Sequence, residues 1–213
     1  LLLNVEIKTG TMRQLKVLVG CEESQAVCKA FRALGHEAYS NDLLPASGGH
    51  PEWHLRMDVF EAIRLNKWDL IILHPPCTKI AVSGNRWYGR GTKGFKERID
   101  AINWTQELWE YANEICNHVA LENPVGTLNK YGFFPRPQYI QPWQFGHGET
   151  KKTGFWLYNL PLLQPTNIVE GREQKVWKMP PSEDRAKLRS KTYQGIAEAM
   201  ASQWSEYILN LEK

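Results

Sequence analysis

The apolar positions of the chain follow two patterns, short continuous runs and longer stretches in which they recur every three or four residues. The continuous runs lie at 15–19, 69–73 and 119–121. They are rich in Val, Ile and Leu, which is typical of parallel strands that are covered on both faces. Helical spacing is found at 25–34, 98–116 and 193–209. These stretches predict amphipathic helices.

Turn residues place further elements between these stretches. A second strand is expected at 36–42, ending on Asp42, after a helix that Gly35 can cap. The other expected elements are a short helix at 60–65, a strand and turn at 154–163, and loops at 45–53 and 126–142. Strands that alternate with helices favour a three-layer, Rossmann-like α/β fold with a mostly parallel central sheet.

Small and polar residues stand where several of these elements begin or end. They are Gly20, Asp42, Asp58, Cys77 and Glu122. In parallel sheets, ligands bind outside the carboxyl ends of the strands. We therefore expect these five residues to lie along one edge of the sheet.

The size and composition of the chain favour one enzyme-sized domain. With 213 residues and 42% hydrophobic content, the chain can bury one core, which we expect over residues 12–213. Residues 1–11 precede Met12 and are expected to be an extension or an expression remnant outside the fold. No apolar run approaches the roughly 18 residues of a membrane-spanning helix, so no membrane partner is expected.

The cysteines argue for a reducing, cytoplasmic location. All four lie at irregular spacings without a CxxC pair, and no signal peptide precedes them. No spacing of His and Cys matches a zinc site, so no metal is expected.

Two short motifs follow the apolar runs. His-Pro-Pro-Cys occupies 74–77 and Glu-Asn-Pro occupies 122–124. The pair resembles the Pro-Pro-Cys and Glu-Asn motifs of the cytosine-5 DNA methyltransferase family. The resemblance implies that Cys77 adds to carbon 6 of cytosine and makes carbon 5 nucleophilic. It also implies that Glu122 donates a proton to ring nitrogen 3 as charge develops there.

The resemblance covers nearly all of 12–204 and is nearest to a compact version of the family found in bacteriophage and prophage genomes. It is carried, in chain order, by VLVGCEES, SNDLLP, WDLIILHPPCT, SGNRW, LENPVGTL, IQPWQFGHGETKKTGFWLYNLPLL and TYQGIAEAMASQW. It implies an S-adenosylmethionine-dependent methyltransferase fold in a bacterial or phage-infected cell, without a large target-recognition domain. The implied partner is DNA, double-stranded with a flipped cytosine.

The resemblance also implies a cofactor site. Asp42 would hold the ribose hydroxyls of S-adenosylmethionine, and Asp58 would face the adenine amine. The other implied cofactor contacts are Gly20, Glu22 and Ser24 on the methionine side, with Val59 and Pro75. The implied substrate contacts are Ser83, Arg86, Asn123 and Lys152.

The sequence departs from the family pattern in three places. The Phe-x-Gly-x-Gly-Gly cofactor loop is replaced by GCEESQ at 20–25, which has one glycine. Glu-Asn-Val reads Glu-Asn-Pro. The Arg-x-Arg element that braces the flipped base is not evident, and Lys151, Lys152 and Arg86 stay open as substitutes.

The segment 79–100, directly after Cys77, is strongly basic. It has six Lys and Arg against two Glu and Asp, a local charge of +4, which exceeds the +3 of the whole chain. It also holds Trp87, Tyr88 and Phe95 with four glycines. This composition predicts a mobile lid that closes over a phosphate backbone and an extruded base.

Each of these candidate functional features also has an ordinary structural interpretation. A lone cysteine after a strand is usually buried filler, Asp favours turns and caps, and a charge run is usually a solvated surface. One functional alternative is methylation of RNA or free cytosine nucleotides. Another is a catalytically silent DNA-binding protein with the same fold. Target specificity has three candidate sources, the segments 79–100 and 126–142 or a second subunit, so a homodimer also stays open.

Overall fold

A single mixed sheet organises the chain. In the computed structural model, which describes residues 13–182 and 184–211, the strands are β1 Lys16–Gly20, β2 Glu37–Asp42, β3 His54–Arg56, β4 Leu70–Leu73, β5 Val119–Pro124, β6 Gln138–Ile140 and β7 Thr153–Tyr158. Their order across the sheet is β3-β2-β1-β4-β5-β7-β6. The pairs from β3 to β5 are parallel, whereas β7 runs antiparallel to both of its neighbours. The expected extension at 1–11 lies outside the described residues.

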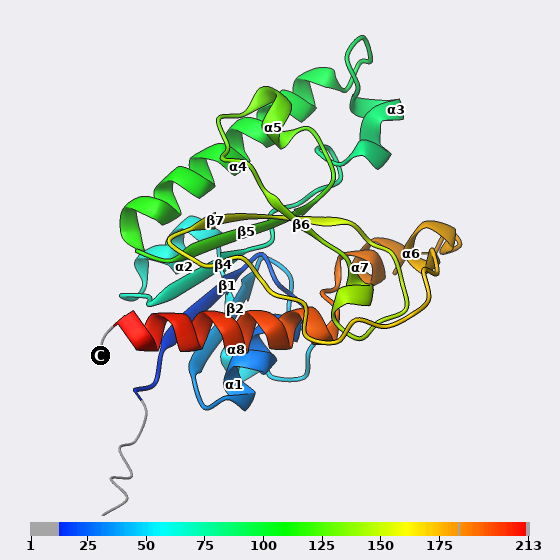
Figure 1. Ribbon diagram of the computed structural model, residues 1–213. Coiled ribbons are helices and arrows are strands. Elements are labelled where there is room, and N and C mark those ends of the chain that lie inside the picture. Colours follow the sequence, from blue (N-terminus) through cyan, green and yellow to red (C-terminus); the bar gives the residue numbers. More distant parts are fainter. Residues whose placement is uncertain (1–12, 183, 212–213) are drawn as a thin grey trace, which may run out of the picture.

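Helices cover both faces of this sheet. They are α1 Ala26–Ala33, α2 Val59–Arg64, α3 Asn85–Tyr88, α4 Phe95–Ile115, α5 Leu128–Tyr131, α6 Lys175–Lys178, α7 Arg185–Ser190 and α8 Gln194–Leu211, with 3₁₀ turns at Pro51–Trp53, Val82–Gly84 and Pro142–Gln144. Helices α1 and α8 lie on one face, and α2 and α4 on the other (Figure 1). The expected three-layer, mostly parallel α/β fold is confirmed.

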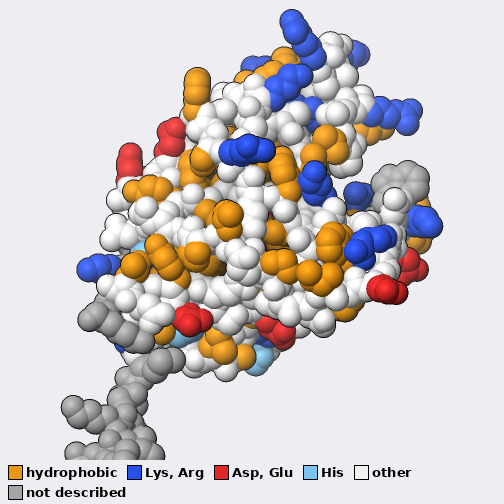
Figure 2. All heavy atoms as spheres, in the orientation of Figure 1, with side chains coloured by type: hydrophobic (Ala, Val, Ile, Leu, Met, Phe, Trp, Pro, Cys, Tyr) orange, Lys and Arg blue, Asp and Glu red, His pale blue; other side chains and the backbone are white. Residues whose placement is uncertain are grey.

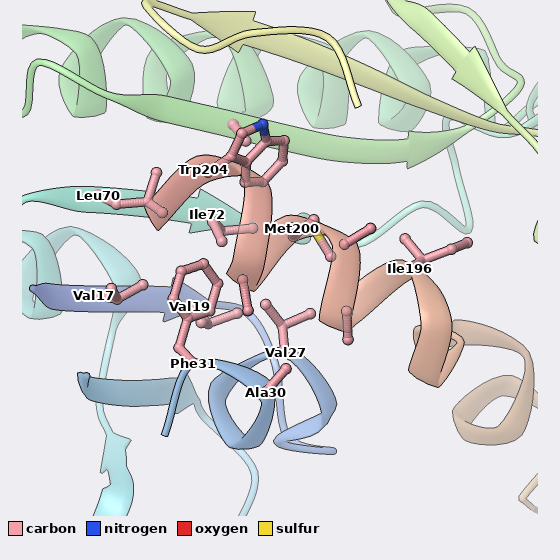
Figure 3. Packing of buried hydrophobic residues seen from close by; sticks show 14 of the residues in the cluster. Val17, Val19, Val27, Ala30, Phe31, Leu70, Ile72, Ile196, Met200 and Trp204 are labelled. Carbon is pink, nitrogen blue, oxygen red and sulfur yellow. The ribbon is translucent and has the colours of Figure 1, made fainter. Parts of the chain in front are cut away.

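The core on the α8 face is built around large side chains. Trp204 and Phe31 are fully buried against the strands, together with aliphatic residues of β1 and β4 (Figure 3). The indole nitrogen of Trp204 donates to the carbonyl of Pro161 at 3.1 Å, so its polar group is satisfied inside the core. This packing holds the last helix against the sheet on the side away from α4.

Several elements differ from the sequence-based expectations. Strands β3 and β6 were not predicted, because three-residue strands carry almost no periodic signal. The expected loop at 126–142 contains α5 and β6, and the expected lid at 79–100 contains α3 and the start of α4. Strand β5 runs three residues beyond its apolar stretch, because β7 pairs with it there, Glu122 opposite Phe155.

Among the described residues, no helix is both long enough and apolar enough to cross a membrane.

Candidate active site

The loop that carries Cys77 is fixed between two strands. It leaves β4 at His74, whose backbone N–H donates to the carbonyl of Gly20 at the end of β1, at 2.9 Å. The carbonyl of Pro75 accepts from the side-chain amide of Asn123 in β5 at 3.0 Å. The carbonyl of Cys77 in turn accepts from two backbone N–H groups, at 3.0 and 2.8 Å. The thiol is therefore held at the carboxyl edge of the sheet by β1 on one side and β5 on the other.

Glu122 faces the same place from β5. Its side chain is 14% exposed, and Oε2 lies 3.2 Å from Nδ1 of His74. Burial raises the pKa of the Cys77 thiol, and the charge of Glu122 raises it further. The structure thus brings together the two residues on which the predicted chemistry depends, close enough for the carboxylate to act on the thiol.

Two cationic side chains oppose the effect of Glu122 on the pKa of Cys77. Lys151, just before β7, and Arg189, in α7, both lower the pKa of Cys77. Lys151 is one of the three substitutes considered for the missing Arg-x-Arg element. Arg189 was not predicted, because it lies 112 positions from Cys77 in a segment without a recognisable motif. Its only sequence signal is the basic character of the stretch 172–191.

A small pocket adjoins Glu122. Its volume of about 10 Å³ is room for about one water molecule. It is lined by Glu122, Lys151, Thr153, Phe155, Thr192, Tyr193 and Ile196. Tyr193 is anchored there because its hydroxyl donates to Glu149 at 2.5 Å. A pyrimidine ring therefore enters this pocket only if the residues around Tyr193 move. The larger cavity, about 640 Å³, lies away from this chemistry, between α1 and α8.

The expected cofactor loop makes a tight turn although it has only one glycine. Cys21 and Gln25 adopt left-handed backbone conformations, with φ of 59° and 60°. Glu22 is buried, and its carboxylate accepts from the N–H groups of Val27 and Cys28, at 2.6 and 3.2 Å, at the start of α1. Burial raises the pKa of Glu22. Ser24 accepts from the N–H of Ala26 at 3.4 Å. Both side chains thus order the turn itself, and their predicted contact with a cofactor stays a prediction.

Two carboxylates flank this turn. Burial raises the pKa of the Cys21 thiol to about 12, and the charges of Asp42 and Asp58 contribute to the rise. Asp42 accepts from the N–H of Leu44 at 2.9 Å, and Asp58 caps α2 through the N–H of Phe60 at 2.9 Å. The plainer turn and cap roles are therefore present. The same placement gathers two carboxylates around one turn, and their predicted contacts with a cofactor stay predictions.

Gly20 and Val59 meet at the centre of this group. A Cβ on Gly20 would stand 2.9 Å from side-chain atoms of Val59 and of Leu73. The glycine therefore allows the start of α2 to pack directly on the ends of β1 and β4. This packing brings Asp58 to the strand edge where Asp42 ends β2.

The four predicted substrate contacts have different surroundings. Asn123 is buried and holds the Pro75 carbonyl, so it positions the Cys77 loop. Ser83 and Arg86 are exposed in the segment after Cys77, where Arg86 lies over the ring of Trp87 at 5.2 Å. Lys152 is exposed and lies over the ring of Tyr139 at 4.7 Å.

The segment after Cys77 contains helical turns and a buried anchor. Arg98, counted among its basic residues, is only 2% exposed. Its guanidinium donates to the carbonyls of Lys79 and Ala81 and to the side-chain oxygen of Asn85, at 2.6, 3.3 and 2.7 Å. Arg98 is therefore a structural brace. Of the other five basic residues, Lys79 is paired with Glu97 at 2.8 Å, and Arg86, Arg90, Lys93 and Lys96 are exposed.

In residues 13–182 and 184–211 there is no group of three or more His, Cys, Asp or Glu side chains that could hold a metal ion.

Comparison with solved structures finds methyltransferases. A prophage-encoded E. coli protein assigned as a DNA modification methyltransferase has a TM-score of 0.50 and 15% identity over 79% of this chain and 56% of its own. The Entamoeba histolytica methyltransferase EhMeth has a TM-score of 0.49 and 12% identity, over 76% and 57%. The S. pombe Dnmt2 methyltransferase has a TM-score of 0.44 and 13% identity, over 78% and 54%.

At these identities the similarity is one of fold. The similarity to the first of these structures supports the Rossmann-like fold expected from the sequence, and that protein is a DNA modification enzyme by assignment. The chain spans just over half the length of each of the three proteins. No family model matches the chain, and no curated protein does.

Proposed function

We propose that the protein transfers a methyl group from S-adenosylmethionine to carbon 5 of cytosine in DNA. The observation that carries the proposal is the convergence of Cys77 and Glu122, which come from loops and strands 45 positions apart, at one edge of a methyltransferase fold. A thiol facing a carboxyl group is the pair that addition to a pyrimidine ring requires.

The residues present fit the cofactor. Asp42 and Asp58 stand on either side of the Cys21 turn, where a nucleoside with hydroxyl and amine groups finds acceptors. Bound S-adenosylmethionine would supply an electrophilic methyl group. Gly20, Val59 and the Glu22 turn would form the rest of its surroundings, with Ser24 and Pro75 beside them.

The chain's own residues would act on the base in sequence. The sulfur of Cys77 forms a bond to carbon 6, and the electron pair released into the ring is met by a proton from Glu122 at nitrogen 3. Lys151 and Arg189 favour the thiolate that begins this step. After methylation, the carbon 5 proton passes to water, its electron pair re-forms the double bond between carbons 5 and 6, and the sulfur of Cys77 leaves as a thiolate.

Charge favours a polynucleotide over a free nucleotide. Besides 79–100, the segment 172–191 has seven Lys and Arg against three Glu and Asp, so each segment carries +4 and the rest of the chain carries −5. On the face shown in Figure 2, Lys and Arg gather over the α3 end and over the α6–α7 segment. Phosphate backbones bind to such surfaces through release of counterions.

The test is covalent capture. A duplex with 5-fluorocytosine, incubated with S-adenosylmethionine, is expected to form an adduct with the wild type that denaturing gels resolve. Cys77→Ser should form none while keeping a cooperative unfolding transition. Methyl incorporation into duplex DNA, RNA and dCMP, measured in parallel, separates the substrates. An adduct that persists in the serine variant would overturn the proposal.

A further inference from the structure

His74 occupies a central position in this site without a role in the chemistry above. It is the first residue after β4, and its side chain is 10% exposed. Its backbone N–H is bound to Gly20, which ends β1, and its ring reaches β5. The imidazole therefore lies between the two strands that frame the Cys77 loop.

The two ring nitrogens have different surroundings. Nδ1 lies 3.2 Å from Oε2 of Glu122, which is hydrogen-bonding distance. Nε2 is buried and has no hydrogen-bond partner within the described part of the chain. A buried ring nitrogen without a partner costs about 1–3 kcal/mol, and a side chain kept in that state needs a reason.

The charged groups around the imidazole ring of His74 supply such a reason. Glu122 faces it from β5, and Glu22 faces it from the turn after β1, where a positive charge on His74 lowers the pKa of the Glu22 carboxyl against the effect of burial. Cys77 stands three residues further along the same loop, and Lys151 and Arg189 act on that thiol. The imidazole is thus the titratable group placed between two carboxyl groups.

We propose that His74 is a positioning residue for Glu122, an inference that rests on the proposed function. A proton on Nδ1 donated to Oε2 fixes which oxygen of Glu122 accepts. Oε1 is then the atom that presents a proton to the pyrimidine.

Two substitutions test the role of the donor. His74→Asn places an amide nitrogen near the position of Nδ1, so it keeps a donor to Glu122. His74→Leu keeps a similar volume and removes the donor. His118→Asn is the matched control, because His118 is part-buried and its ring contacts the carbonyl of Asp69, away from Cys77.

The kinetic readout uses the wild type and all three variants. His74→Leu should lower kcat about 10- to 100-fold, less than the roughly 100- to 10,000-fold that a placed acid itself contributes, with the KM for S-adenosylmethionine unchanged within about twofold. His74→Asn, which keeps the donor, should recover most of kcat. The control should match the wild type. A leucine variant with wild-type kcat, or an asparagine variant as slow as the leucine variant, overturns the inference.

A second readout does not depend on methyl transfer or on the leucine variant folding. In ¹⁵N-histidine-labelled wild type, ring nitrogen shifts should show the neutral ring of His74 with its proton on Nδ1, and Glu122→Gln should change these shifts. A neutral ring protonated on Nε2 alone refutes the inference even if the enzyme methylates DNA. The opposite result is also informative. If the proton is on Nδ1 but the protein forms no adduct with 5-fluorocytosine, the proposed function is refuted, whereas the contact between His74 and Glu122 is established.

Discussion

The carboxylate of Glu122 raises the pKa of the Cys77 thiol, after burial the largest contribution to that rise. The proposed reaction needs a thiolate at Cys77 and a proton on Glu122. These two requirements support each other, because protonation of Glu122 removes a negative charge that opposes the thiolate. Once Glu122 holds a proton, the thiolate of Cys77 therefore forms more easily than it does beside the carboxylate.

Glu122→Gln should make Cys77 more reactive towards iodoacetamide while abolishing methyl transfer. In the wild type the raised pKa keeps the sulfur protonated at neutral pH, so alkylation should increase as the pH rises. Removal of the carboxylate lowers that pKa, and at pH 8 alkylation should be about threefold to tenfold faster, since one pKa unit is a factor of ten. Peptide mapping by mass spectrometry gives the rate at Cys77.

Glu114→Gln serves as the control for this experiment, because Glu114 is exposed at the end of α4. It should leave the rate unchanged. An equal or slower rate in Glu122→Gln would show that the carboxylate does not act on the sulfur.

Substitutions at Asp58 should separate its role as the N-cap of α2 from the role of its negative charge in cofactor binding. Asp58→Asn keeps an oxygen that accepts from the N–H of Phe60, so the stability of α2 should be retained. Asp58→Ala should lower the free energy of unfolding by about 1 kcal/mol. Both should weaken S-adenosylmethionine binding about tenfold or more in calorimetry, since both lose a charged acceptor. Wild-type affinity in the asparagine variant would exclude a role of the carboxylate in binding.

Arg98→Met should destabilise the protein by about 2–4 kcal/mol, because it leaves two backbone carbonyls and the Asn85 side chain without their donor. Arg90→Met, at an exposed position, should change the free energy of unfolding by less than about 0.5 kcal/mol. Urea unfolding measures both. Similar values for the two variants would mean that Arg98 does not brace the segment after Cys77.

Neutralising Lys93 and Lys96 should weaken binding to duplex DNA equally for all sequences. For every phosphate that is no longer neutralised, the slope of log K against log salt should fall in magnitude by about 0.9. Lys67→Gln is the control, since Lys67 is exposed just before β4, at the opposite end of that strand from Cys77. Fluorescence anisotropy over a salt series measures the slopes. A slope unaffected by the double substitution would remove the start of α4 and the turn before it from the DNA-binding surface.

The sequence by itself determined the central strands and the long helices, and it pointed to the pair that we propose as reactive. The apolar runs behind β1, β4 and β5 are local signals, because a strand buried on both faces must be apolar throughout. Cys77 and Glu122 were singled out because each belongs to a short motif that begins where such a run ends, and because these two motifs resemble those of a known family.

Only the tertiary structure decided how these residues act on one another. The approach of Arg189 to Cys77, the burial of Arg98 and the contact between His74 and Glu122 join residues far apart in the chain. A charge in a sequence does not reveal whether it will be solvated or buried, since that depends on which backbone carbonyls and carboxylates the fold brings to it. The groups that a side chain contacts and the depth of its burial are properties of the packed chain. These properties place Arg98 in the scaffold and His74 in the candidate site.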